Sequence, residues 1–536
     1  MEIYDHIVVG AGSAGCAVAA RLSEDPARRV LLVEAGGGDR VLASRAPAGF
    51  SELIDSARDW GYLTEPEPGL DGRRIPEPRG RLLGGCSAMN AMLWIRGSHL
   101  DYDGWDLPGW SWEEVLPTFL RMEDHLLRDD AHGHGGPMRV RRLRDPDPVA
   151  RAFVESSAAA GIARTEDLSG PDLDGVSLAP TTTSGGRRWS TVRGYLDGAR
   201  RRPNLTVVTG ALVHRVVIEG GRAVGVELER RGTVRRVGAR REVILSAGAF
   251  NTPHLLQLSG VGDAEHLRDI GVEPLVDNPA VGAHLQEHPF TFCNYELREP
   301  WLGLSDAARP QHVLRWLLTG RGKLASNVAE ALAHVRTLPD LPAPDMQLVH
   351  APVFFWENGK AEHPRPAFAI AQSYWTPASR GTVRAVSRDP RRLPAVQLNL
   401  LTERADLEAM VRGIRLTREI VAQGPLADMV SVEITPGPDV RTGEELERWV
   451  RRTCLNTYHP AGTARMGEPG EGVLDARLRV HGVAGLRVAD ASALPRITRA
   501  NTNAPAILVG ERCADFVRED ERAGAAVRAP QLVAGA

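Results

Sequence analysis

A glycine-rich turn between two apolar stretches constrains the fold more than any other feature of this chain. Residues 3–9 form a short β-rich run, and three glycines follow it with the spacing GxGxxG. Residues 14–22 are small and apolar, which is typical of a helix packed closely on a sheet, and residues 30–33 form a second apolar strand that ends at Glu34. Strand, turn, helix, strand and acid in this order predict a Rossmann-type α/β unit with a nucleotide crevice.

Each position of this turn has a physical role in binding a dinucleotide. Gly10 permits the tight turn out of the strand, Gly12 has no Cβ and lets a pyrophosphate approach, and Gly15 lets the helix pack against the strand. The helix N-terminus supplies free N–H groups and the positive end of its dipole to the phosphates. Glu34 is placed to accept hydrogen bonds from a ribose 2′-hydroxyl, and it disfavours the 2′-phosphate of NADP. The motif alone leaves both FAD and NAD open.

The bulk composition is that of a globular protein. With 536 residues the chain is too long for one ordinary core, so two domains are expected. Hydrophobic residues make up 43% and charged residues 25%, values within the range of globular domains. The formal net charge of −3 gives no indication of a nucleic-acid partner or of binding to an acidic membrane.

The cysteines and the apolar runs bear on the compartment. The five cysteines are Cys16, Cys86, Cys293, Cys454 and Cys513. They are odd in number, far apart and without a CxxC pair, so neither a disulfide framework nor a zinc site is expected. The first apolar run is too short for a signal peptide, and no apolar stretch reaches the roughly 18 residues of a membrane span. We therefore expect a cytoplasmic protein with no membrane span.

Several further elements follow from pattern. Residues 59–97 are rich in proline and glycine and are expected to form a functional loop, in which residues 82–94 pass close to a ligand and then enter a helix. Alternation predicts strands at residues 205–213 and 215–228, with a hairpin turn at Gly220–Gly221.

The second half of the chain changes in character. Residues 242–247 read as a buried strand, and a helix is expected to begin at Asn251 with Pro253 in its first turn. Residues 291–452 contain tryptophans, aliphatic strands and a helical stretch at 404–423. We expect this part to form a second domain that caps the first.

Five motifs stand in a fixed order along the chain. The first is the glycine turn with Glu34, and the second is GRLLGGCSAMNAMLWIRG at residues 80–97. The third is GAFNTPHLLQLSGVG at residues 248–262, and the fourth is YHPAGTARMG at residues 458–467. The fifth is ADASALP followed by NTNAP, within residues 489–505. In this order the motifs resemble the glucose–methanol–choline (GMC) flavin oxidoreductases, and the resemblance runs almost end to end.

The resemblance implies an α/β fold with two domains. A Rossmann-type FAD-binding domain would be assembled from discontinuous segments, and an α+β substrate domain would contain an antiparallel sheet. The expected boundaries are residues 1–152, 187–290 and 453–522 for the FAD-binding domain, 153–186 and 291–452 for the substrate-binding cap domain, and 523–536 for a C-terminal tail.

The same resemblance implies how FAD is held. Residues 84–93 would lie beside the isoalloxazine and the pyrophosphate, Val213 would contact the adenine end through its backbone, and Asp490 with Ala491 would hold the ribityl–phosphate part. The expected cofactor-binding residues are Gly10, Gly12, Ser13, Ala14, Gly15, Glu34, Ala35, Gly84, Gly85, Ser87, Asn90, Ala91, Met92, Leu93, Val213, Tyr458, Asp490, Ala491 and Asn503.

The attachment of the flavin is expected to be non-covalent. In some GMC enzymes a histidine near the second motif bonds covalently to the flavin, and the matching position here is Met89, which cannot do so. Cys86 lies at a position that is often small in the family, and we interpret it as a packing residue rather than a flavin anchor.

By the same resemblance, His459 and Asn501 are the expected catalytic pair. Oxidation of an alcohol removes a proton from oxygen and a hydride from carbon, and histidine has a suitable pKa for the proton. FAD accepts the hydride at N5, and an asparagine amide can donate a hydrogen bond to the developing oxyanion. Asn503 is two residues from Asn501, and we expect it to contact the flavin or to brace the turn.

Two other pairs of residues could in principle bind a metal ion or a cationic substrate. His284 and His288 have i, i+4 spacing, but Pro289 and the lack of a third ligand nearby argue against a metal, and none is expected. Glu330 and Glu357, in the expected cap domain, could pair with a cationic substrate, although the favoured reading is that they are solvated or salt-bridged.

The expected function is FAD-dependent oxidation of a primary alcohol of choline-like, sugar or amino-sugar type. The partners would be a small-molecule alcohol and an electron acceptor, either O2 or another carrier, with a homodimer left open. The alternatives are a hydroxynitrile-lyase-type flavoprotein of the same fold, an NAD-dependent dehydrogenase and a non-catalytic flavin binder.

Overall fold

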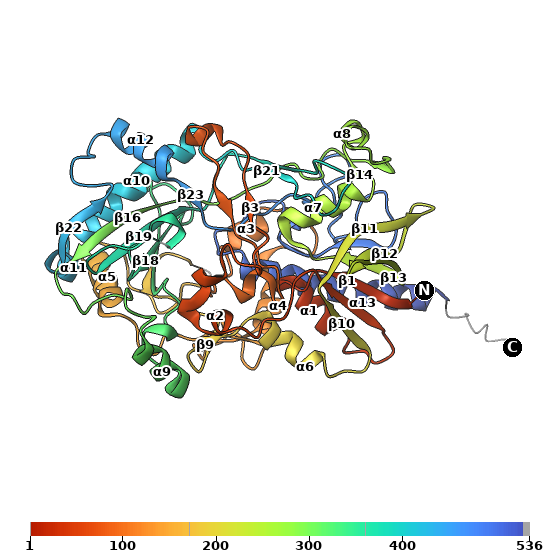
Figure 1. Ribbon diagram of the computed structural model, residues 1–536, viewed down its shortest axis with the longest axis horizontal. Helices are drawn as coiled ribbons and strands as arrows, with labels where there is room; N and C mark the ends of the chain where they lie inside the picture. The colour runs from red at the N-terminus through yellow and green to blue at the C-terminus, as the bar shows by residue number, and fades with distance from the viewer. Residues whose placement is uncertain (1, 171, 360, 529–536) are drawn as a thin grey trace.

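Two sheets organise the chain, as the computed structural model in Figure 1 shows. The structure describes residues 2–170, 172–359 and 361–528. The strands of the first sheet and the glycine turn lie in one half of the molecule, and a second, antiparallel sheet lies in the other half. The α/β fold with a Rossmann-type part and an antiparallel substrate part is therefore confirmed.

The first sheet has a parallel body with an antiparallel extension. The parallel strands are, in order, β10 (Leu205–Thr209), β2 (Val30–Glu34), β1 (Glu2–Val9), β13 (Thr233–Leu245) and β24 (Leu486–Val488). The first half of β13 continues into an antiparallel pair with β12 (Arg222–Arg230), which pairs in turn with β11 (Ala211–Glu219). β1 lies in the middle of the parallel strands, and its residues 4–9 are buried, as is typical of a strand covered on both faces.

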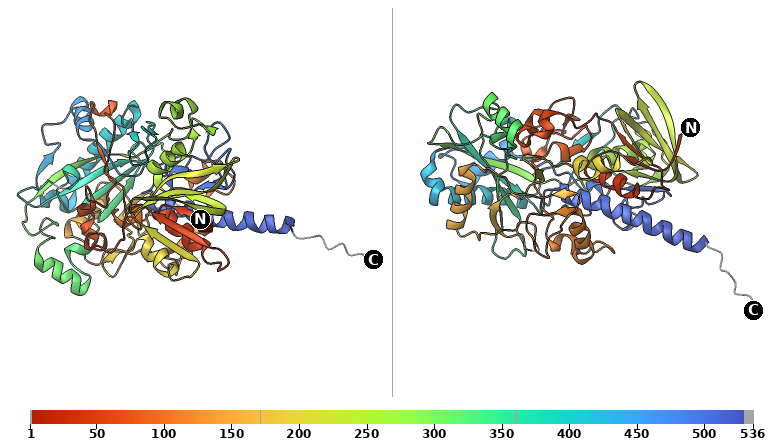
Figure 2. Two further views of the ribbon diagram at one scale, coloured as in Figure 1. Left: turned by 45° about the vertical axis from the view of Figure 1, so that its right-hand side comes forward. Right: turned by 90° about the horizontal axis from the view of Figure 1, so that it is seen from below.

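Two helices pack against each other beside this sheet. α1 (Ser13–Leu22) follows the glycine turn, and α13 (Asn503–Arg528) returns from the far end of the chain to lie against it. Figure 2 shows the last turns of α13 projecting beyond the body of the protein. The predicted tail from residue 523 is therefore helical as far as Arg528, and the rest of it lies outside the described residues.

The second sheet is antiparallel throughout. Its order is β22 (Val430–Thr435), β16 (Pro289–Leu297), β19 (Ala367–Tyr374), β18 (Met346–Ala351), β17 (Ala331–Val335) and β7 (Gly175–Leu178), with β23 (Leu455–Asn456) also on β16. Alternate side chains point to opposite faces, and one face packs on α5 (Pro148–Ala159) and α10 (Arg404–Val421). Two further helices, α11 (Gly424–Met429) and α12 (Gly443–Thr453), pack against this pair of helices. The other face is turned toward the first half of the molecule.

The connecting segments contain the remaining helices and short strands. The helices are α2 (Leu42–Arg45), α3 (His99–Asp103), α4 (Trp112–Met122), α6 (Asp197–Ala199), α7 (Gly248–Leu258), α8 (Ala264–Asp269) and α9 (Pro310–Thr319). The short strands are β3 (Tyr62–Leu63), β4 (Pro76–Glu77), β5 (Glu123–Asp124), β6 (Met138–Arg139), β8 (Thr183–Ser184), β9 (Arg187–Arg188), β14 (Val261–Gly262), β15 (Val276–Asp277), β20 (Thr382–Arg384) and β21 (Ala395–Gln397). Within the described residues, no helix combines the length and the apolar character that crossing a membrane requires.

The predicted elements agree with the structure apart from local differences. The hairpin at Gly220–Gly221 is confirmed, but the strand predicted over residues 205–213 is broken at Gly210, whose φ is +65°. α7 begins three residues before the predicted start. Residues 82–94 do not enter a helix: apart from a single 3-10 turn at Gly85–Ala88, they follow an irregular, partly extended path.

Each sheet has its own hydrophobic core. The first core lies around β1, α1 and α13, and the second lies between the antiparallel sheet and α5 and α10. Val149 and Phe153 of α5 both belong to the second core, so the predicted boundary after residue 152 falls inside one helix. Tyr62 and Leu70 also pack there, although they belong to the stretch predicted for the first domain.

Candidate active site

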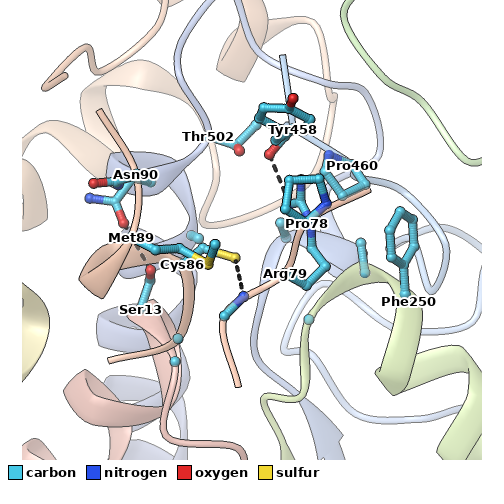
Figure 3. A pocket seen from close by; sticks show the side chains of 18 of the residues that line it. Ser13, Pro78, Arg79, Cys86, Met89, Asn90, Phe250, Tyr458, Pro460 and Thr502 are labelled. Atoms are coloured by element: carbon cyan, nitrogen blue, oxygen red, sulfur yellow. Dashed lines mark hydrogen bonds between the residues drawn. The ribbon is translucent and has the colours of Figure 1, made fainter. Parts of the chain in front are cut away.

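A cavity of about 380 Å³ lies between the two halves. On one side it is reached by the carboxyl ends of β1, β2 and β13, which is where open α/β sheets bind ligands. On the other side it is closed by β16, β18 and β19 of the antiparallel sheet. In Figure 3, Ser13, Cys86 and Asn90 lie on one side of this cavity, and Arg79 and Phe250 lie on the other.

The glycine turn leaves space for a dinucleotide. Gly10 has a φ of +99°, and a Cβ there would lie 2.4 Å from the carbonyl oxygen of Ser246. At Gly12, by contrast, the nearest atom to a Cβ would be 4.0 Å away, so this part of the backbone is open to the cavity. A backbone that is crowded on one side and bare on the other fits the pyrophosphate of FAD.

Two acids frame the cavity at this end. Glu34 accepts the backbone N–H of Ala11 (3.0 Å) and of Gly36 (2.8 Å), and burial raises its pKa to about 7. Asp490 accepts the N–H of Gly248 (2.9 Å) and the hydroxyl of Thr252 (2.6 Å), and burial raises its pKa as well. Both carboxylates hold the loops that line the cavity, and both are part of its wall.

His459 and Asn501 meet at the wall of the cavity that faces the antiparallel sheet. Asn501 Nδ2 lies 3.4 Å from His459 Nε2, and His459 Nδ1 lies 2.8 Å from Thr457 Oγ1. The same nitrogen, His459 Nδ1, also lies 3.1 Å from His288 Nδ1. Each nitrogen of the His459 ring therefore has its own neighbours.

These contacts favour one tautomer of His459. The Asn501 amide donates to Nε2, so Nε2 carries the lone pair and Nδ1 carries the proton. Thr457 Oγ1 can accept that proton's hydrogen bond, because its own hydroxyl donates to the carbonyl of His288 (3.3 Å). Burial, then His288 and Arg79, hold the pKa of His459 well below its usual value, so the imidazole is neutral near pH 7.

A buried acid fixes the backbone of His459. Glu287 Oε1 accepts the backbone N–H of His288 (2.8 Å) and of His459 (2.8 Å), and burial raises the pKa of Glu287. Arg79 donates to the carbonyl of Tyr458 (2.8 Å) and pairs with Glu77 (3.4 Å). The sequence did not single out Glu287, Arg79 or Glu77.

The two neighbouring asparagines have different partners. Asn501 Oδ1 accepts from Gln347 Nε2 (3.2 Å), a residue of β18, so the amide of Asn501 is oriented by the antiparallel sheet. Asn503 begins α13, and its Oδ1 accepts from Ser13 Oγ (2.8 Å), which braces the glycine turn. The structure thus brings Asn501, and not Asn503, to His459.

The cavity gathers most of the predicted residues. Those that line it are Gly10, Gly12, Ser13, Ala14, Glu34, Ala35, Gly85, Asn90, Ala91, Met92, Leu93, Val213, Tyr458, His459, Asp490, Ala491, Asn501 and Asn503. Gly15, Gly84 and Ser87 lie behind the wall: Ser87 donates to the carbonyl of Gly84 (2.7 Å) and contacts Thr191 (2.8 Å). These three support the lining rather than form it.

The remaining candidates lie elsewhere or have other roles. His288 contacts His459, and among the described residues no group of three His, Cys, Asp or Glu could hold a metal ion. Glu330 is buried, accepts from Ser326 Oγ (2.5 Å) and from the N–H of Asp147 (2.6 Å), and does not line the cavity. Glu357 is exposed and also lies outside the cavity wall, so neither acid faces a substrate there.

Comparison with known proteins decides the family. Residues 4–290 match the N-terminal model of the GMC oxidoreductases, and residues 377–510 match the C-terminal model. The chain belongs to the GMC oxidoreductase family. It is therefore an FAD-dependent oxidoreductase acting on CH–OH donors, which removes the NAD-dependent dehydrogenase from the alternatives.

Three relatives illustrate the similarity of this GMC oxidoreductase. An uncharacterised GMC-type oxidoreductase of Mycobacterium tuberculosis (strain ATCC 25618 / H37Rv) is 41% identical over 525 residues, covering 96% of this chain and 99% of the relative. An oxygen-dependent choline dehydrogenase of Rhizobium johnstonii is 40% identical over 530 residues, covering 96% and 95%. The structure of pyridoxine 4-oxidase from Mesorbium loti superposes with a TM-score of 0.88 at 32% identity, covering 96% and 99%.

Proposed function

We propose that this GMC oxidoreductase converts an alcohol to a carbonyl compound, with His459 as the base that takes the hydroxyl proton. The observation that carries the proposal is the pairing of His459 Nε2 with Asn501 Nδ2 at the wall of the cavity. A lone pair and an N–H donor side by side match the two needs of an alcohol oxygen that loses its proton.

In the proposed reaction His459 and Asn501 have separate roles. His459 Nε2 accepts the proton from the substrate hydroxyl, while the Nδ1–H stays hydrogen-bonded to Thr457 and keeps the ring in place. The amide of Asn501, oriented by Gln347, donates to the substrate oxygen as negative charge develops on it. The glycine turn would hold FAD, which when bound would supply the acceptor for the hydride that leaves the carbinol carbon.

The cofactor is proposed to be held without a covalent bond. Met89, buried in the cavity wall, has a thioether that cannot replace the histidine link of some relatives. Cys86 also lines the cavity, but its sulfur accepts a hydrogen bond from the N–H of Gly80 (3.5 Å) and packs against the loop. The physiological electron acceptor is O2 or another carrier.

The test is flavin reduction without oxygen in the His459→Ala variant. Replacement of a general base lowers the rate by about 100-fold or more while FAD stays bound, because His459 is not part of the glycine cradle. Stopped-flow absorbance of the flavin measures this rate for wild type and variant with the same alcohol. Equal rates would show that His459 is not the base. Bleaching by none of the alcohols, together with cleavage of a cyanohydrin, would favour the lyase alternative.

A further inference from the structure

The part of the cavity in front of His459 and Asn501 is walled by apolar side chains. β18 presents Val349 and Ala351, and β19 presents Ala369 and Ala371 from the neighbouring positions. The period of two along a strand explains this, since the residues between them face the second core. Phe290 of β16 completes the wall.

An aromatic corner closes this apolar chamber, and it is fixed in place. The ring of Phe355 meets Phe290 edge-on at 5.8 Å between centroids and Phe292 at 5.2 Å. The backbone of Phe355 is tied to Asn294 of β16, which accepts the N–H (2.9 Å) and donates to the carbonyl (3.1 Å). The chamber therefore has a preformed apolar surface, as small-molecule sites commonly do.

The charged side chains of the cavity wall are engaged by partners of their own. Among the described residues that line the cavity, the carboxylates are Glu34 and Asp490, and both accept backbone N–H groups at the dinucleotide end. Arg79 is paired with Glu77 and with the carbonyl of Tyr458. Gln347, an uncharged polar residue of the wall, is committed to Asn501 and to His334 (3.1 Å).

We propose that the substrate is an uncharged alcohol with an aliphatic or aromatic body, and not a quaternary ammonium, amino-sugar or sugar alcohol. The proposal rests on the proposed function and narrows it. A cation in this chamber would lose its water without gaining a carboxylate counter-ion, and only the rings of Phe290 and Phe355 could offset that loss. The extra hydroxyls of a sugar would lose their water against the apolar wall formed by β18 and β19. A hydrocarbon body gains from burial against Val349, Phe290 and Phe355.

A pair of isosteric alcohols tests the proposal. 3,3-Dimethylbutan-1-ol has the shape of choline with carbon in place of the charged nitrogen. We expect kcat/KM for flavin reduction to be about tenfold or more higher for the neutral alcohol than for choline, because only the cation must be desolvated without a partner. Equal values, or a preference for choline, overturn the proposal while the proposed function stands. If neither these two alcohols nor benzyl alcohol, hexan-1-ol or glucose reduces the flavin, the proposed function fails, and this inference with it.

A matched pair of variants separates charge from shape. Ala371→Asp places a carboxylate in the chamber wall, and Ala371→Asn is its uncharged counterpart of nearly equal size. The ratio of kcat/KM for choline to that for 3,3-dimethylbutan-1-ol should rise about tenfold or more in Ala371→Asp relative to Ala371→Asn. Val349→Asp and Val349→Asn provide the same comparison from β18 if the first pair does not fold. An unchanged ratio in a folded, flavin-containing pair contradicts the placement of the substrate in this chamber.

Discussion

At the scale of single residues, the glycine turn requires that Gly15 has no Cβ. A Cβ at this position would lie 1.9 Å from the carbonyl oxygen of Gly10, which is backbone and cannot move aside without opening the turn. Gly37 lies on a nearby loop, and a Cβ there would meet nothing within 4 Å. Substitutions of these two glycines are therefore a matched pair for testing whether the glycine turn binds FAD.

We expect Gly15→Ala to purify without FAD or to fail to fold, whereas Gly37→Ala keeps its flavin. The added methyl of Gly15→Ala must push the turn apart, so the N–H groups at the start of α1 no longer converge on the pyrophosphate. The ratio of flavin to protein absorbance, with circular dichroism to check folding, measures the outcome. Full flavin content in Gly15→Ala would mean that the turn does not bind the dinucleotide.

The sequence predicted site residues that lie within motifs. It did not predict site residues whose partners are distant along the chain. His459 and Asn501 were predicted because both lie in motifs that resemble a known family. Gln347 and Glu287 were missed, because their contacts are 154 residues from Gln347 to Asn501 and 172 residues from Glu287 to His459. Neither residue lies in a sequence pattern that identifies its partner, and only the folded chain brings Gln347 to Asn501 and Glu287 to His459.

At the scale of elements, His350 shows how a polar side chain can be buried between a helix and a sheet. Its ring stacks on Phe153 of α5 and lies beside Phe368 of β19, each at 5.4 Å between centroids. Neither ring nitrogen has a hydrogen-bond partner among the described residues. Burial lowers the pKa of His350 to about 3, so it stays neutral in the folded protein while the unfolded chain protonates it near pH 6.5.

His350→Phe should stabilise the protein, and the gain should grow as the pH falls. Below about pH 6.5 the unfolded state binds a proton that the folded state rejects, so wild-type stability declines with falling pH until about pH 3. The variant lacks this loss, which amounts to about 2–3 kcal/mol at pH 4.5 relative to pH 8. Urea unfolding at the two pH values measures the difference. A variant whose advantage is the same at both would contradict the neutral, buried state of His350.

Element prediction succeeded where local pattern and tertiary environment agree. The strand–turn–helix start and the hairpin at Gly220–Gly221 were predicted from residues that contact one another locally. The helix expected within residues 82–94 was wrong, because the backbone there is claimed by distant partners. Trp94 N–H donates to the carbonyl of Pro180 (3.0 Å), and the carbonyl of Met92, whose φ is +59°, accepts the N–H of Thr182 (2.8 Å). Tertiary contacts thus override the apolar pattern.

At the scale of the whole molecule, the cavity is built from both halves, so a cofactor bound there stabilises the arrangement of the two cores. The glycine turn and Glu34 come from the first sheet, while Gln347 and Phe290 come from the second. A ligand that binds only the folded state adds RT ln(1 + [L]/Kd), which is about 4 kcal/mol at a thousandfold excess over Kd. Removal of FAD should therefore lower the stability of the contact between the two halves as well as the stability of each half.

This expectation can be checked by calorimetry of the protein with and without FAD. Because the flavin is proposed to be non-covalent, acid treatment in high salt should release it, and added FAD should restore its absorbance. The FAD-free protein should unfold at a lower temperature and over two transitions, one for each core, whereas the loaded protein should unfold at a higher temperature in one. ADP can fill only the dinucleotide end of the cavity. It should therefore raise the unfolding temperature of the first core alone. Flavin that stays with the denatured protein would instead reveal a covalent link at the cavity wall, with Cys86 the first position to examine.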